Sequence, residues 1–228
     1  VFTVLKVVVY VFGIDFLTET HASEWLMWVA AFTLLSSSVI ALTKDNLKAR
    51  LAYSTISQLA YITLGAAIAT KWAIVGGSLH IVMHAVGKIT LFFAAGALIV
   101  LVHKTEISDM AGIGRKMPWT MGAFFVGSLC IIGIPPSGGS WSKWYLLMSA
   151  ADANVWLMGV LLISSLFSIG YLMPVVTTAF FKPLPPESDH DHHDDHHHEG
   201  SGNVEYDHIL CVIPPVLTAA GCVLLFLF

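Results

Sequence analysis

The hydrophobic residues of this chain fall into long apolar runs separated by short polar connections. A helix needs about 20 apolar residues to cross the hydrocarbon core of a bilayer, and most of the runs have this length. They lack the alternating pattern of membrane β-strands, and a helix satisfies its own backbone hydrogen bonds in lipid. The pattern therefore predicts an all-α integral membrane protein, a polytopic bundle of about seven transmembrane helices. The expected spans are Val1–Leu17, Glu24–Thr43, Leu51–Thr70, Ala73–Val102, Trp119–Ala150, Val155–Phe181 and His208–Phe228.

The composition supports this class of protein. Of the 228 residues, 56% are hydrophobic and only 11% are charged. The sequence has no cluster of basic residues of the kind that predicts nucleic-acid binding. Cys130, Cys211 and Cys222 lack metal-ligand spacing, so we expect buried thiols, with no metal site and no cofactor. Residues 1–12 are already apolar without the basic start of a signal peptide, and we therefore expect the sequence to be part of a longer chain.

Basic residues in the connections indicate how the chain is oriented. They occupy every second connection, while the intervening connections contain only Lys71. Cytoplasmic loops are enriched in Lys and Arg, so we expect these loops in the cytoplasm of a multi-pass protein of the cell (inner) membrane. This assignment requires residues 119–150 to cross the membrane once. The basic residues are Lys44, Lys48 and Arg50, then Lys104, Arg115 and Lys116, and finally Lys182.

The composition changes abruptly after the sixth run. Residues 182–207 are rich in Pro, Asp, Glu and His and cannot bury enough apolar surface to fold alone, so we expect a solvated cytoplasmic loop. A His/Asp tract can bind zinc, nickel or copper loosely, but nothing in the sequence defines a coordination geometry. The expected division is a transmembrane domain at 1–181, this loop at 182–207, and a final helix at 208–228.

Three titratable residues lie in the middle of the fourth run. His80, His84 and Lys88 recur every four residues, which on a helix places them on one slowly drifting face over about 12 Å. A single histidine there would be interpreted as a neutral core imidazole bonded to a neighbouring helix. Lys88 is too far from the span end to extend its ammonium to the interface, and a charge at bilayer depth costs about 2.5 to 3.5 kcal/mol. Three such groups in register therefore indicate a path for protons or cations.

A further candidate, Lys143, follows an interruption of the fifth run. Pro135 and Pro136 remove two backbone donors, and Gly138 and Gly139 relax the chain, so we expect the helix to stop and restart there. Interrupted helices at membrane depth line ion sites in transporters. The alternative is a re-entrant turn whose lysine extends to the membrane interface.

Three motifs in this order resemble one known family. Residues 45–58 read DNLKARLAYSTISQ, residues 80–88 read HIVMHAVGK, and residues 133–144 read GIPPSGGSWSKW. They are similar to the antiporter-like subunits shared by respiratory complex I and the Mrp-type multisubunit sodium/proton antiporters. The stretch SKWYL at residues 142–146, together with the His-rich loop, is most similar to the D subunit of the Mrp antiporters.

This resemblance implies a fold and a role for each candidate residue. The chain would correspond to the C-terminal half of a family member, the second repeat of an inverted-repeat transporter fold with one broken helix. Lys88 would be the central proton carrier, His80 and His84 its connecting relay, and Lys143 the exit-side carrier. Some relatives have glutamate at the position of Lys143, so the resemblance does not transfer the identity of the ion.

The implied function is proton translocation by a membrane subunit of a multisubunit monovalent cation (sodium)/proton antiporter. The alternative is a proton-pumping subunit of an NADH:quinone oxidoreductase or related redox complex. We expect no redox chemistry in the chain itself, because it has no cysteine cluster for iron and sulfur and residues 112–114 lie outside a dinucleotide-binding setting. The expected partners are other membrane subunits, protons, sodium in the antiporter case, and the lipid bilayer. A purely structural subunit is a third alternative, which the buried charges disfavour.

Overall fold

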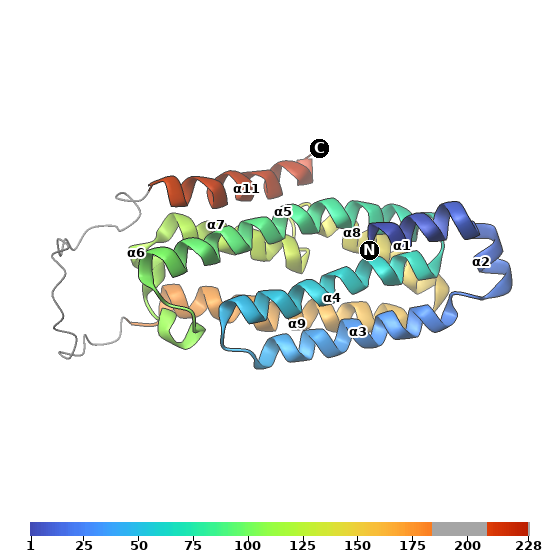
Figure 1. Cartoon of the computed structure of the whole chain (residues 1–228), viewed down its shortest axis with the longest axis horizontal. Helices are drawn as coiled ribbons and strands as arrows, with labels where there is room; N and C mark the ends of the chain where they lie inside the picture. Colours follow the sequence, from blue (N-terminus) through green and yellow to red (C-terminus); the bar gives the residue numbers. More distant parts are fainter. Residues whose placement is uncertain (184–208, 228) are drawn as a thin grey trace.

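The computed structural model describes residues 1–183 and 209–227. Their long helices lie along one common axis, and α2 (Ile14–Thr20) crosses it at one end (Figure 1). Within the described residues, five helices are long and apolar enough to cross a membrane, namely α3, α4, α5, α9 and α11, and two shorter apolar segments lie at 2–12 and in α7. The predicted helical membrane fold is therefore confirmed. The elements are α1 (Phe2–Lys6), the π-helix η1 (Val7–Phe12), α2 (Ile14–Thr20), α3 (Glu24–Thr43), α4 (Leu47–Ile68), α5 (Lys71–Val102), the 3-10 helix η2 (Ile107–Met110), α6 (Ile113–Lys116), α7 (Pro118–Ile132), α8 (Gly139–Ala153), α9 (Val155–Phe181) and α11 (Ile209–Leu227). All but two residues of the predicted His/Asp-rich loop at 182–207 lie outside the described residues.

The first predicted span differs from the structure. Instead of one helix over Val1–Leu17, the helical segment ends at Phe12 and α2 begins at Ile14. Gly13 between them has φ +80° and ψ 147°. An L side chain rarely adopts this backbone conformation and glycine does so at no steric cost, so the chain changes direction here.

Side-chain caps determine where two of the long helices begin. The Asn46 side chain accepts a hydrogen bond from the Ala49 amide at 3.2 Å, so α4 begins at Leu47, four residues before the predicted start. Thr70 caps α5 in the same way, accepting from the Ala73 amide at 3.3 Å. Each cap satisfies an amide that would otherwise lack a partner in the first turn.

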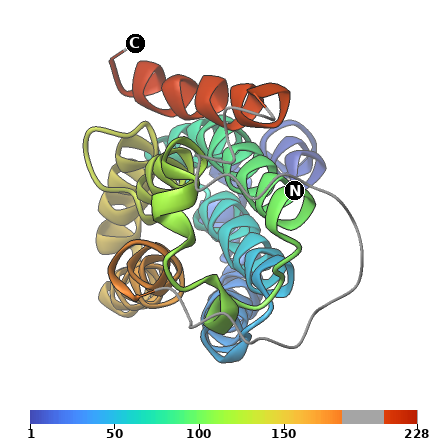
Figure 2. The same ribbon diagram turned by 90° about the vertical axis from the view of Figure 1, so that its left-hand side faces the viewer.

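The bundle places the three basic connections at one end. The α3–α4 turn, the α6 region and the end of α9 lie together there, opposite α2 (Figure 1). The pair α7 and α8 runs in succession from that end toward the other, so the interrupted segment crosses the bundle once. Seen along the bundle, α11 lies at its periphery, against α5 and α7 (Figure 2).

Close packing explains the glycine at the start of α8. A Cβ added at Gly139 would overlap the carbonyl group of Cys130 in α7, which is rigid backbone. We expect Gly139→Ala to destabilise the protein by about 1 to 3 kcal/mol or more, since the two half-helices would have to separate. The matched control is Gly122→Ala, because a Cβ there meets no atom within 4 Å. Thermal melting of the purified protein in detergent measures both, and equal melting temperatures would contradict this packing account.

Candidate functional site

The buried face of α5 carries the three titratable residues that were predicted to share one side of a helix. We call His80, His84 and Lys88 the ladder of α5. His80, His84 and Lys88 are only 2%, 7% and 5% exposed. Because α5 is continuous from Lys71 to Val102, the four-residue spacing keeps them on one side of the helix. The rings of His80 and His84 stack with their centroids 6.0 Å apart.

Lys88 is held by α4. Its Nζ donates hydrogen bonds to the Leu51 carbonyl at 3.0 Å and to Ser54 Oγ at 2.8 Å. Ser54 in turn donates to the Tyr171 hydroxyl of α9 at 3.0 Å, and that hydroxyl also contacts Ser168 Oγ at 3.0 Å. No carboxylate pairs with Lys88 among the described residues, and the protein groups that bind this amine there are a hydroxyl and a carbonyl dipole.

Lys143 lies just inside α8 and reaches back to the end of α7. Its Nζ donates to the Ile132 carbonyl at 3.0 Å and to Ser165 Oγ of α9 at 3.3 Å, and it lies 4.8 Å from the centroid of the Tyr61 ring. Ile132 is the last residue of α7, where helix carbonyls lack intrahelical partners and carry the negative end of the helix dipole. The interruption of the helix therefore creates the acceptor that Lys143 binds.

The two histidines lie between the lysines. His84 interacts electrostatically with both Lys88 and Lys143, whereas His80 interacts with His84 and Lys143. His80 Nδ1 also hydrogen-bonds Ser142 Oγ at 2.9 Å, next to Lys143 in α8. The structure thus brings together the four residues named by the sequence.

Several buried polar atoms near the two lysines and two histidines have no hydrogen-bond partner among the described residues. They are His80 Nε2, His84 Nδ1 and both side-chain amide atoms of Gln58, which lies close to the Tyr171 hydroxyl without reaching hydrogen-bond geometry. Buried polar groups in proteins are usually bonded to protein or to ordered water, and an unbonded group costs about 1 to 3 kcal/mol. The chemistry of these atoms fits bound water.

Two polar helix faces, on α4 and α9, were not predicted from the sequence. On α4, Ser54, Gln58 and Tyr61 recur at helical spacing, and all three residues are at most 1% exposed. Ser54 contacts Lys88 and the Tyr61 ring lies beside that of His80. On α9, Ser165 contacts Lys143 and the Tyr61 hydroxyl, and Tyr171 contacts Ser54. The sequence feature that indicates these faces is the recurrence of polar residues every three or four positions within apolar spans.

The predicted hinge residues occupy the interruption between α7 and α8. Pro135 and Pro136 lie in the connection, Gly138 precedes the first turn of α8, and Gly139 begins it. The Gly138 amide donates to the Cys222 carbonyl of α11 at 3.1 Å. The connection is therefore packed against α11 as well as against α7.

The comparisons with known proteins agree with this architecture. The NADH-quinone oxidoreductase subunit N of Desulforudis audaxviator is 41% identical over 161 residues, which cover 70% of this chain and 32% of that protein. A chain of the Mrp complex from Dietzia sp. DQ12-45-1b has a TM-score of 0.78 at 21% identity, covering 93% of this chain and 45% of that one. A chain of respiratory complex I from Thermus thermophilus has a TM-score of 0.61 at 22% identity, covering 90% and 43%. The two structural likenesses show the fold.

In the part of the chain that the structure describes, the α7–α8 interruption and the buried lysines and histidines define a helical membrane bundle with a polar interior. The family model described as "NADH:quinone oxidoreductase/Mrp antiporter, TM" matches residues 2–168, and the chain belongs to this family. It spans about a third of the length of the subunit N relative and about half of the Mrp chain.

Proposed function

We propose that this chain translocates protons across a membrane, with Lys88 as the central carrier and Lys143 as the carrier at the interrupted helix. The observation that carries the proposal is the buried line of titratable groups between these two amines. Amines placed at this depth are costly in a membrane protein, which favours a functional role over a stabilising one. In the same proposal, residues 1–181 and 208–228 form the membrane unit and 182–207 a cytoplasmic loop.

Protons would move along the line by way of the histidines and water. His80 Nε2 and His84 Nδ1 are buried, without a partner in the described part of the chain, and able to accept or donate a proton. Water bonded to these atoms and to the Gln58 amide would connect them to the lysines. Ser54, Ser142 and Ser165 contact Lys88, His80 and Lys143 and would orient the groups at each step.

The central position of His84 supports electrostatic coupling between the two lysines. Because His84 interacts electrostatically with both Lys88 and Lys143, a change in the charge of either lysine would act on this shared neighbour. Moving one charge through 100 mV of membrane potential supplies about 2.3 kcal/mol. One pKa unit corresponds to about 1.4 kcal/mol, so a potential of this size is comparable with a shift of between one and two pKa units.

The assembly we propose first is a multisubunit monovalent cation (sodium)/proton antiporter in the cell membrane, with the basic loops in the cytoplasm. The likeness to the Mrp chain favours it. The second candidate is a proton-pumping subunit of an NADH:quinone oxidoreductase, favoured by the identity to subunit N. The two candidates are distinguished by the activity of the complex that co-purifies with the chain. Sodium-dependent proton exchange by this complex supports the antiporter, and quinone reduction by NADH supports the oxidoreductase.

Replacing the central histidine tests the relay. We expect His84→Asn to slow proton translocation about 100-fold, because asparagine can hydrogen-bond but cannot take up a proton in this pH range. The matched control is His103→Asn, an exposed histidine at the end of the same helix whose left-handed backbone asparagine tolerates. Proton uptake into liposomes containing the assembled complex measures both. Equal rates for His84→Asn and wild type would remove His84 from the proposed path.

A further inference from the structure

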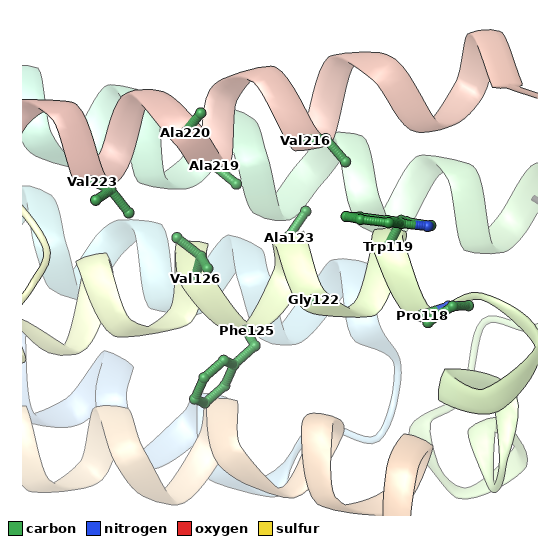
Figure 3. A pocket seen from close by; sticks show the side chains of 10 residues that line it. All are labelled: Pro118, Trp119, Gly122, Ala123, Phe125, Val126, Val216, Ala219, Ala220 and Val223. Carbon is green, nitrogen blue, oxygen red and sulfur yellow. The ribbon is translucent and has the colours of Figure 1, made fainter.

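An apolar groove lies between α7 and α11 on the outside of the bundle (Figure 3). Its volume is about 710 Å³, within the range of ligand sites in proteins, and its lining is almost wholly apolar. From α11, Val216, Ala219 and Val223 point toward α7, and the ring of Trp119 lies between the two helices (Figure 3). Small residues, including Gly122 and Ala123, keep the groove open on the α7 side.

The length of the groove favours a lipid chain over a partner helix. On α11 it extends from Val216 to Val223, which corresponds to about 10 Å of helix. A transmembrane helix of another subunit would need a contact along much of the hydrocarbon core, which is about 30 Å thick. A groove of this length covers part of one leaflet and fits a stretch of the acyl chain of a single lipid.

The basic residues near one end of the groove indicate which kind of lipid headgroup would lie there. The exposed Arg115 and Lys116 end α6, and one residue separates them from Pro118 and Trp119, which line the groove at the basic end of the bundle. The start of α7 also presents the positive end of its helix dipole there. Tryptophan is enriched at the level of lipid headgroups, and clustered basic residues beside a span attract anionic lipids.

We propose that the α7–α11 groove binds one anionic phospholipid, with an acyl chain between the helices and its phosphate beside Arg115 and Lys116. The α11 helix also contacts the interruption of the α7–α8 segment, through Gly138 and through the Trp141 indole, which donates to the Phe226 carbonyl at 3.2 Å. A lipid in this groove would therefore stabilise α11 next to the proposed proton path. The site does not depend on the proposed function.

The test uses the assembled complex in nanodiscs with photoreactive phosphatidylglycerol or phosphatidylcholine carrying the same diazirine acyl chain. We expect labelling of α7 and α11 peptides by phosphatidylglycerol. Gly122→Leu should reduce this labelling at least about tenfold, because the new side chain fills open space in the groove. Gly159→Leu in α9 is the matched control, since a Cβ there also meets no atom within 4 Å and the residue lies outside the groove.

The headgroup is tested separately. Arg115→Gln and Lys116→Gln should each weaken phosphatidylglycerol labelling about fivefold and leave phosphatidylcholine labelling unchanged. Equal labelling in Gly122→Leu and Gly159→Leu would overturn the proposal. So would equal labelling by the two lipids in the wild type, or crosslinks from the groove to a neighbouring protein subunit in place of lipid.

Discussion

Replacing Lys88 with alanine is expected to reduce proton translocation by about 100-fold or more while the complex still assembles. The change removes the amine that links the α5 ladder to Ser54 and Tyr171. Assembly should survive, because Lys88 has no carboxylate partner among the described residues and its removal therefore leaves no unpaired buried charge. Proton uptake into liposomes, together with the yield of assembled complex, gives both quantities.

Two further variants separate the roles of charge and proton transfer at this position. Lys88→Arg keeps a positive charge that is not released in proteins, so we expect it to block translocation as Lys88→Ala does. Lys48→Ala removes an exposed lysine from α4 and should translocate at the wild-type rate. Wild-type flux in Lys88→Ala would exclude Lys88 as the carrier.

Replacing Lys143 with alanine is expected to have the second-largest effect, a similar loss of translocation together with a lower melting temperature. Lys143 donates to the Ile132 carbonyl at the end of α7, and hydrogen bonds from charged groups contribute about 1.5 to 3 kcal/mol. Loss of the side chain therefore removes both the proposed carrier and a cap on the broken helix. Flux and thermal melting in the same preparation measure the two effects.

Glutamine at position 143 distinguishes the two effects. Its amide can donate a hydrogen bond but does not titrate, so Lys143→Gln should recover part of the melting temperature without recovering translocation. Lys71→Ala, an exposed lysine at the start of α5, is the control for loss of charge alone. If Lys143→Gln restored the wild-type flux, Lys143 would act only as a structural cap.

The sequence predicted the elements whose signals are local. Continuous apolar runs predicted the membrane helices, four-residue spacing predicted the shared face of His80, His84 and Lys88, and two prolines beside two glycines predicted the interruption before α8. Each of these rests on helix geometry or on the missing donor of proline, which act within a few residues.

The remaining features depend on contacts between distant residues or on backbone angles. Ser54 and Tyr171 are 117 positions apart, and their contact requires the packing of α4 against α9. Hydroxyl groups in membrane helices commonly bond to their own backbone, as Thr55 does, so their presence alone does not indicate a polar path. Gly13 ends the first helical segment through a positive φ that the residue type permits but does not require.

The most direct test of the central claim is an electron cryo-microscopy map of the assembled complex at a resolution that shows ordered water. We predict water bonded to His84 Nδ1, His80 Nε2 and the Gln58 amide, forming a continuous hydrogen-bonded line from Lys88 Nζ to Lys143 Nζ. Dry side-chain packing around these atoms, in a map that shows ordered water elsewhere in the protein, would contradict it.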